Sequence, residues 1–252
     1  MYLDFIRPGV LSLMAMVAAD TAQAQSFVFG AGDTDTLTTR LTDGEYGSAT
    51  SVIIMQSGET VYEAYFREAD AETLHDTRSV TKTITGYAVA TAIDDGLLTL
   101  SSAASGFFPD YEPEIAADPR KAQITVEDLL TMSSVMECND WTEFSAGNEE
   151  RMYLTEDWSR FFWSLPIRGY PSWATPPEEA TYGRAFSYCT AGVQLLGELV
   201  SRAGEQPLTE RIEQRIFEPL GIDNWEWPRN GPGSWRTWRR WAWNPGAWTS
   251  RR

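Results

Sequence analysis

The sequence predicts an α/β fold in which an antiparallel sheet packs against helices, and two patterns support this prediction. Apolar runs at residues 51–56 and 60–66 flank a Ser-Gly pair, which is typical of a β-hairpin. A long apolar segment at residues 79–95 then shows helical spacing. We therefore expect the hairpin to pack against this helix. A mostly helical subdomain, over about residues 100–200, is expected to cover one side of a cleft.

The helix at residues 79–95 is predicted from apolar side chains that recur at intervals of three and four residues. Gly96 follows this segment and is suited to a helix C-terminus. The predicted inward face consists of Ile84, Tyr87, Ala88 and Ala92, with Thr91 as its polar interruption.

The middle of the chain is predicted to contain two helices and a loop. Thr125, with Asp128 three residues later, resembles a capping box that opens a short helix. A helix is also expected over residues 149–165, where Pro166 stops it. Residues 167–187 mix prolines and glycines with aromatic residues, which indicates an irregular loop.

Two further helices are predicted after this loop. The first spans residues 190–203 and ends at Gly204, and the second spans residues 207–217. Their predicted inward positions are Val193, Leu196, Leu199 and Val200 in the first helix and Leu208, Ile212 and Ile216 in the second.

Composition limits the classes of function. The 252 residues, of which 42% are hydrophobic, suffice for one large domain or two small ones with a real core. A formal net charge of -16 argues against nucleic acid and anionic membrane surfaces as partners. The single histidine, His75, disfavours a zinc site, and a Ser-His-Asp triad would have to include it. We expect His75 to be a structural residue in a turn, and we expect no cofactor.

The N-terminal residues 1–24 are predicted to be a signal peptide. Their apolar run is too short to span a bilayer, and Ala22-Gln23-Ala24 fits a small-residue cleavage site. The alternative is a frayed N-terminal helix. Since no later segment is long and apolar enough to cross a membrane, we expect a periplasmic or secreted protein.

Export favours a disulfide between the two cysteines, Cys138 and Cys189. The alternative is a pair of free, buried thiols. The bridge would join the residue next to Tyr188 to the loop that follows residues 125–134, and could thereby fix the tyrosine.

A Ser-x-x-Lys sequence, from Ser79 to Lys82, opens the predicted helix in a chain that has only two lysines. The two side chains are expected about one helical turn apart on the same face. A lysine kept neutral by desolvation can remove the proton of a serine hydroxyl, and a helix N-terminus favours a developing oxyanion. Taken alone, the two residues could instead be a capping serine and an exposed lysine.

Three ordered segments resemble the serine β-lactamase and penicillin-recognising superfamily: LHDTRSVTKTITGYAVATAIDDGLLTL, ITVEDLLTMSS and FSYCTAGVQLLGELVSRAGEQPLTERIEQRIFEPLGI. The resemblance covers about residues 45–228, within an expected partial hydrolase domain at residues 25–228. It is nearest to the branch that holds class C β-lactamases, D-alanyl-D-alanine peptidases, esterases and aminohexanoate-oligomer hydrolases. It implies a β-lactamase-like fold that hydrolyses a small ester, amide or peptide-like substrate through an acyl-enzyme.

The resemblance also implies roles for individual residues. Ser79 would be the nucleophile, Lys82 its base, and Tyr188 the group that passes the proton to the leaving group. Thr190 occupies the substrate-binding position at which the family's Tyr-x-Asn motif has an asparagine. This difference weakens a β-lactamase interpretation and favours an esterase or amidase.

Residues 229–252 depart from the family pattern. They hold six arginines, five tryptophans and no acidic residue, and the family's third motif, Lys-Thr-Gly or His-x-Gly, is not found. We therefore expect the C-terminal strands to be missing and this tail to result from a truncation or a change of reading frame. The alternative is a genuine cationic segment that binds membrane surfaces. Two functions stay open: a serine hydrolase, or a catalytically inactive remnant or binding module of the same family.

Overall fold

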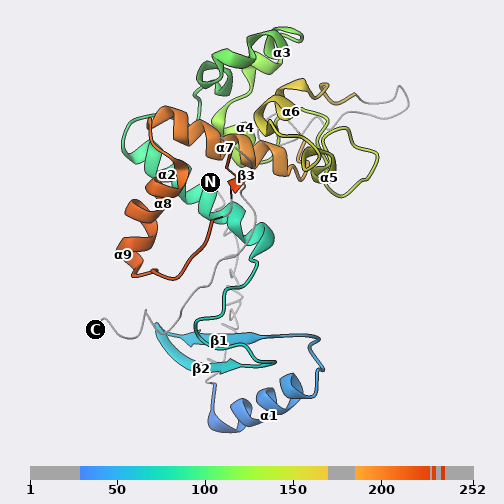
Figure 1. Ribbon diagram of the computed structural model, residues 1–252. Helices are drawn as coiled ribbons and strands as arrows, with labels where there is room; N and C mark the ends of the chain where they lie inside the picture. Colours follow the sequence, from blue (N-terminus) through green and yellow to red (C-terminus); the bar gives the residue numbers. More distant parts are fainter. Residues whose placement is uncertain (1–28, 170–184, 228, 231–233, 236–252) are drawn as a thin grey trace, which may run out of the picture. The chain divides into compact units, whose positions relative to one another are not determined.

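The computed structural model describes residues 29–169, 185–227, 229–230 and 234–235 (Figure 1). Contacts divide the chain into two units, residues 1–46 and residues 47–252. The first unit contains helix α1 (Ala31–Thr42), whose start is capped where the backbone N–H of Gly30 donates to the carboxylate of Asp33 at 2.9 Å. The predicted signal peptide lies outside the described residues.

The predicted hairpin is present as strands β1 (Ser51–Gln56) and β2 (Glu59–Tyr65), which pair antiparallel. Ser57 and Gly58 form the turn with positive φ angles of 54° and 84°. Positive φ angles at both central residues are what a tight two-residue hairpin turn needs. Within these two strands only Tyr62 is buried, so the hairpin leaves much of its apolar surface partly exposed.

Helix α2 (Thr81–Asp94) follows a 3₁₀ turn at Arg78–Val80, and the chain leaves it through Gly96, whose φ is 72°. The prediction that Tyr87 lies on the inward face is wrong, because its side chain is 57% exposed. The helix is apolar on more than one side, and its smaller residues are the ones turned inward. The buried positions are Thr81, Thr85, Ala88, Val89 and Ala92.

Helix α7 (Thr190–Ala203) lies at the centre of the helical part of the second unit (Figure 1). It packs against α2, α4 (Val126–Leu130) and α6 (Trp158–Ser164). Its predicted inward residues are all buried: Val193, Leu196, Leu199 and Val200. Ten of its fourteen residues are buried, so it forms the middle of the core rather than one wall of it.

The main packing partners of α2 differ from the expectation. Among the described elements, α2 packs against α7 and α8 (Leu208–Ile212), and the hairpin is not one of its main contacts. The inward face of α2 consists of small residues, and these two helices occupy it. Buried Arg211 of α8 also donates to the Asp95 carboxylate at 2.8 Å, which fixes the end of α2.

The single helix predicted at residues 149–165 is wrong, because the chain forms two short helices there. Helix α5 (Glu149–Met152) begins at Asn148, whose side chain accepts the N–H of Glu150 at 3.0 Å. Asp157 then caps α6 by accepting the N–H of Arg160 at 2.8 Å. A second cap within the predicted helix starts a new helix.

The other described elements are short. The predicted capping box is confirmed, since the backbone N–H of Thr125 donates to Asp128 at 2.9 Å and that of Asp128 donates to Thr125 at 3.2 Å. The predicted helix at residues 207–217 is instead a succession of segments. The remaining elements are α3 (Glu112–Ala116), the π-helical turn Glu213–Phe217, α9 (Glu218–Leu220), β3 (Arg229–Asn230) and β4 (Ser234–Trp235), and 3₁₀ turns at Ala104–Phe107, Pro109–Tyr111 and Lys121–Gln123.

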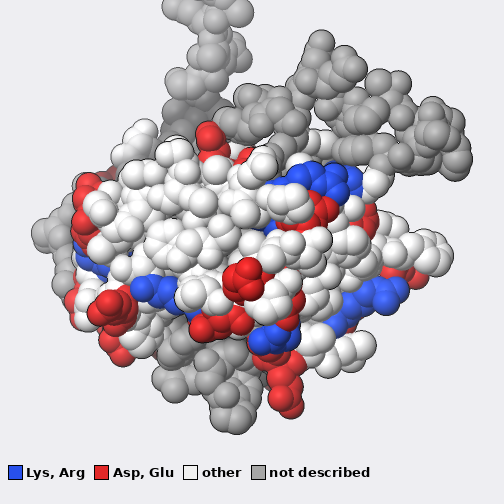
Figure 2. Space-filling model, turned by 90° about the horizontal axis from the view of Figure 1, so that it is seen from above, with Lys and Arg blue, Asp and Glu red and all other residues white. Residues whose placement is uncertain are grey.

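Most of the predicted loop at residues 167–187 and most of the tail at residues 229–252 lie outside the described residues. Within the described part of the chain, no helix is long and apolar enough to span a bilayer. On the face seen in Figure 2, basic side chains lie beside acidic ones, with broad uncharged areas between these groups.

Candidate active site

Ser79 and Lys82 meet at the start of α2. The Lys82 Nζ lies 3.2 Å from the Ser79 Oγ, within hydrogen-bonding distance. Ser79 is exposed on the 3₁₀ turn, whereas Lys82, on the first turn of α2, is half-buried. Arg78, immediately before Ser79, has a φ of 47°, a left-handed conformation that is strained for a residue other than glycine. The nucleophile candidate is therefore presented by a sharp bend of the backbone.

Burial changes the proton affinity of Lys82. Desolvation lowers its pKa to about 8, although the negative charges of Glu149 and Asp140 act in the opposite direction. A lysine with this pKa is partly neutral near neutral pH, and a neutral amine can accept a proton from a hydroxyl. The same 3.2 Å contact can therefore carry a proton from Ser79 to Lys82.

Tyr188 joins this pair. The Lys82 Nζ lies 4.9 Å from the centroid of the Tyr188 ring, a distance typical of a cation–π contact. The structure thus brings together the three residues that the sequence analysis singled out as catalytic. Tyr188 is half-buried in the segment directly before α7, and it presents its ring to the lysine.

Residues 138–141 are linked to residues 187–190 by several contacts. The expected disulfide between Cys138 and Cys189 is present, with Cα atoms 5.3 Å apart. The backbone N–H of Asp140 donates to the carbonyl of Tyr188 at 2.9 Å, and the Ser187 hydroxyl donates to the carbonyl of Cys138. These links hold the backbone on both sides of Tyr188.

Thr190 lies in the core at the start of α7. It is fully buried, and its backbone N–H and its hydroxyl donate to Asp140 Oδ2 at 2.7 Å and 2.6 Å. Its Oγ1 also lies 3.0 Å from Glu149 Oε2. Since both carboxylates engage the hydroxyl, substrate binding by Thr190 stays a prediction.

Sequence reasoning missed Asp140, Trp141 and Glu149. Asp140 and Trp141 follow Cys138 closely, so the pairing of Cys138 with Cys189 was the available signal that they would lie beside Tyr188. Glu149 opens α5 and gave no signal of its own.

The contact that the structure shows for His75 is with Thr50 and not with Ser79, Lys82 or Tyr188. Its Nδ1 is 3.4 Å from the Thr50 hydroxyl, next to the hairpin. This contact agrees with the structural role expected for it.

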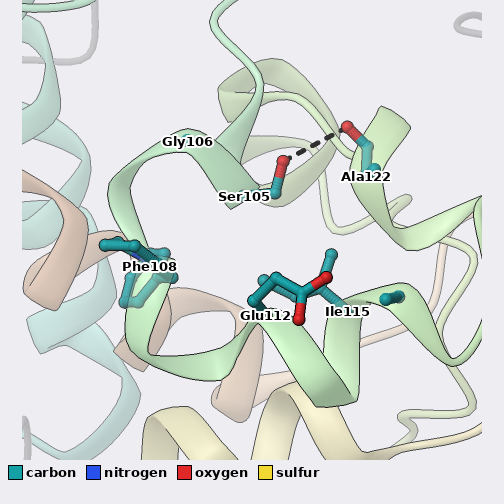
Figure 3. Close-up of a pocket in the computed structure, with 8 residues that line it drawn as sticks. Ser105, Gly106, Phe108, Glu112, Ile115 and Ala122 are labelled. Carbon is teal, nitrogen blue, oxygen red and sulfur yellow. Dashed lines mark hydrogen bonds between the residues drawn. The ribbon is translucent and has the colours of Figure 1, made fainter.

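Two cavities lined by described residues lie away from Ser79, Lys82 and Tyr188. One of about 320 Å³ is lined by residues between Ser105 and Ala122, and Figure 3 shows the Ser105 hydroxyl donating to the Ala122 carbonyl at its rim, a contact of 3.3 Å. None of the residues that line it belongs to the Ser79 site.

Comparison with known proteins identifies the family. A sequence model of the family described as Beta-lactamase matches residues 36–252. The chain belongs to the β-lactamase family. The resemblance inferred from the three segments is thereby confirmed, and the β-lactamase-like fold is supported by solved structures.

Three similar proteins illustrate the likeness. Esterase EstB from Burkholderia gladioli is 28% identical over 181 residues, which are 68% of this chain and 44% of the esterase. A structure from Bacillus anthracis, assigned as a 6-aminohexanoate-dimer hydrolase, has a TM-score of 0.60 at 17% identity. The match covers 82% of this chain and 53% of the hydrolase chain. The octameric penicillin-binding protein homologue from Pyrococcus abyssi has a TM-score of 0.55 at 21% identity. The match covers 78% of this chain and 44% of the homologue. The chain thus spans about half the length of the proteins it matches.

Proposed function

We propose that this β-lactamase family member hydrolyses an ester or amide through an acyl-enzyme on Ser79. The observation that supports this most directly is the 3.2 Å contact between Ser79 Oγ and the Nζ of Lys82. A serine hydroxyl needs a base to become a useful nucleophile, and Lys82, with a pKa of about 8, is the titratable group in contact with it.

The proposed reaction has two halves. Neutral Lys82 takes the hydroxyl proton as Ser79 Oγ attacks the carbonyl carbon of the substrate. The Tyr188 hydroxyl then protonates the leaving alcohol or amine and regains a proton from Lys82, so that the acyl group remains on Ser79. Water next attacks the acyl carbon, and its proton returns to the Ser79 oxygen as the carboxylic acid leaves.

The charge on the tetrahedral intermediate needs hydrogen-bond donors. Within the described residues, the backbone N–H of Ser79 is one such donor, and the positive end of α2 adds a favourable field. Losing one oxyanion donor typically lowers kcat by about 10²–10³. The rate of turnover therefore depends on whether a second donor is available.

The substrate class is inferred from Thr190 and from the relatives. Thr190 replaces the asparagine that would bind the amide of a β-lactam, and one relative is an esterase. We therefore favour an ester or a simple amide over a β-lactam. We also propose that the protein works in the periplasm or outside the cell, since the Cys138–Cys189 disulfide suits an oxidising compartment.

The second candidate is a catalytically inactive remnant or a binding module of the same family. It stays open because neither Lys-Thr-Gly nor His-x-Gly occurs in these 252 residues. This candidate predicts a folded protein whose Ser79 does not react.

A fluorescent fluorophosphonate separates the two candidates, because it labels activated serines covalently. The hydrolase proposal predicts labelling of the wild-type chain, no labelling of Ser79→Ala, and a nearly equal loss in Lys82→Ala, since the two residues act as a unit. A fluorescent penicillin, used in parallel, tests the preference against β-lactams. Labelling that persists in Ser79→Ala would refute the assignment of the nucleophile, and a folded wild-type chain that stays unlabelled would favour the inactive remnant.

A further inference from the structure

Two exposed aromatic side chains continue the proposed active site outward from Tyr188. Trp141 stacks on the Tyr188 ring, with centroids 5.5 Å apart, and Phe186 packs on Trp141 with centroids 6.1 Å apart. The exposed fractions are 75% for Trp141 and 56% for Phe186. The same tyrosine ring contacts the amine of Lys82, which contacts the Ser79 hydroxyl. An unbroken series of contacts therefore joins the exposed aromatic rings to the candidate nucleophile.

The backbone that carries Trp141 is fixed on both sides, although its side chain is exposed. The N–H of Trp141 donates to Asn139 Oδ1 at 3.0 Å. The side-chain amide of Asn148 donates to the carbonyls of Asp140 at 3.2 Å and Thr142 at 3.1 Å. A fixed backbone lowers the entropy that is lost when a surface side chain binds a ligand. Exposed apolar groups of this kind are typical of ligand-binding surfaces.

The charge of this segment limits what can bind there. Residues 137–150 contain no basic residue and five acidic ones: Glu137, Asp140, Glu143, Glu149 and Glu150. An anionic ligand is repelled by these carboxylates, whereas an uncharged aromatic ring is not. Aromatic side chains bind such a ring by offset or edge-on stacking. The surface is therefore suited to a flat, uncharged group.

We propose that Trp141 and Phe186 form an aryl surface, which binds the aromatic leaving group of an uncharged aryl ester or aryl amide. In the proposed reaction Tyr188 protonates the leaving group, so this part of the substrate lies at the tyrosine and its ring extends over Trp141. Trp141 is then a specificity-determining residue that contacts the substrate. The assignment to the leaving group rests on the proposed function, whereas the binding of an aryl amide does not.

Binding is measured in the Ser79→Ala chain, which cannot form the acyl-enzyme. The probe is N-(2-naphthyl)acetamide, a stable and uncharged aryl amide, and equilibrium dialysis gives its Kd. We expect the further replacement Trp141→Ala to weaken binding about tenfold, and Trp141→Phe, which keeps a flat ring, to retain most of it. The saturated decahydronaphthyl amide has the same carbon skeleton but no flat face. It should bind more weakly, with little dependence on Trp141.

Phe144→Ala is the matched control. Phe144 belongs to the same segment and is 93% exposed, but it is not one of the stacked rings. Its removal should leave the Kd of the naphthyl amide in place. A carboxylate added to the naphthyl ring should weaken binding at low salt, because residues 137–150 are acidic.

Turnover of two esters separates binding of the aryl group from orientation of Tyr188. The ratio of kcat/KM for 2-naphthyl acetate to that for ethyl acetate should fall about tenfold in Trp141→Ala. A loss of tyrosine orientation lowers both values together and leaves this ratio unchanged. Phe144→Ala should also leave the ratio unchanged.

Equal Kd values with and without Trp141, or a loss that Phe144→Ala shares, would overturn the proposal. Self-association that depends on Trp141, together with no binding of the amide, would also overturn it and give the surface to a second copy of the chain. Trp141-dependent binding without ester hydrolysis by the wild-type chain would retain the aryl surface and refute the hydrolase function. Hydrolysis with the same ester ratio in wild type and Trp141→Ala would do the reverse.

Discussion

The indole of Trp141 lies parallel to the phenol ring of Tyr188, with ring centroids 5.5 Å apart and an interplanar angle of 6°. Trp141 is 75% exposed, so it contributes little to the core. It is also adjacent to Asp140, whose backbone binds the carbonyl of Tyr188. An exposed tryptophan in this position orients the tyrosine more than it stabilises the fold.

Trp141→Ala is therefore expected to slow the labelling of Ser79 while leaving stability nearly unchanged. An aromatic pair of this kind contributes about 1 kcal/mol, which corresponds to a rate loss of about fivefold if the stacking orients Tyr188 for proton transfer. Trp141→Phe keeps an aromatic face and should recover most of the rate. Labelling rates and thermal unfolding of both variants check this, and equal rates in wild type and Trp141→Ala would contradict it.

The pH dependence of labelling should follow the proton on Lys82. Because burial lowers the pKa of Lys82 to about 8, the neutral, basic form predominates above that pH and the ammonium form below it. We expect the rate constant for labelling to rise with pH, with a midpoint near pH 8, and then to level off. A rate that falls as pH rises from 6 to 9 would exclude neutral Lys82 as the base.

Removing the disulfide should weaken both the fold and the site. The bridge joins residues 51 positions apart, and such a cross-link typically stabilises by about 2–4 kcal/mol. We expect the double replacement of Cys138 and Cys189 by alanine to lower the free energy of unfolding by this amount, as measured by urea denaturation. It should also slow labelling, since Cys189 adjoins Tyr188. Two titratable thiols in the unreduced native protein would contradict the premise.

The sequence predicted those parts of the site that depend on local pattern or on segments resembling the family. Ser79 and Lys82 are three positions apart where a 3₁₀ turn runs into α2, so their contact follows from local spacing. The boundaries of α7 followed from its apolar spacing and from Gly204. Asp140 could not be predicted, because its contact with Thr190 spans 50 positions of sequence and depends on how the loop folds.

The errors in the predicted helices have equally specific causes. The orientation of α2 was mistaken at Tyr87 because that helix is apolar on more than one side, so spacing alone does not define its inward face. The break before α6 was missed because Asp157 looks like an ordinary polar residue of a helix until its side chain is seen to cap the next one.

Gly147 and Gly86 should respond in opposite ways to replacement by alanine. A Cβ at Gly147 would lie 2.7 Å from the carbonyl oxygen of Glu137 and 2.8 Å from the Cα of Cys138, so Gly147→Ala must displace the segment that bears the disulfide. We expect a loss of about 1–3 kcal/mol in the free energy of unfolding, together with slower labelling of Ser79. Gly86 lies within α2 with nothing inside 4 Å of the added carbon, so Gly86→Ala should stabilise the helix by about 0.5–1 kcal/mol. Urea denaturation of the two variants checks both signs. A Gly147→Ala protein as stable as wild type would mean that Glu137 and Cys138 are not held against this glycine.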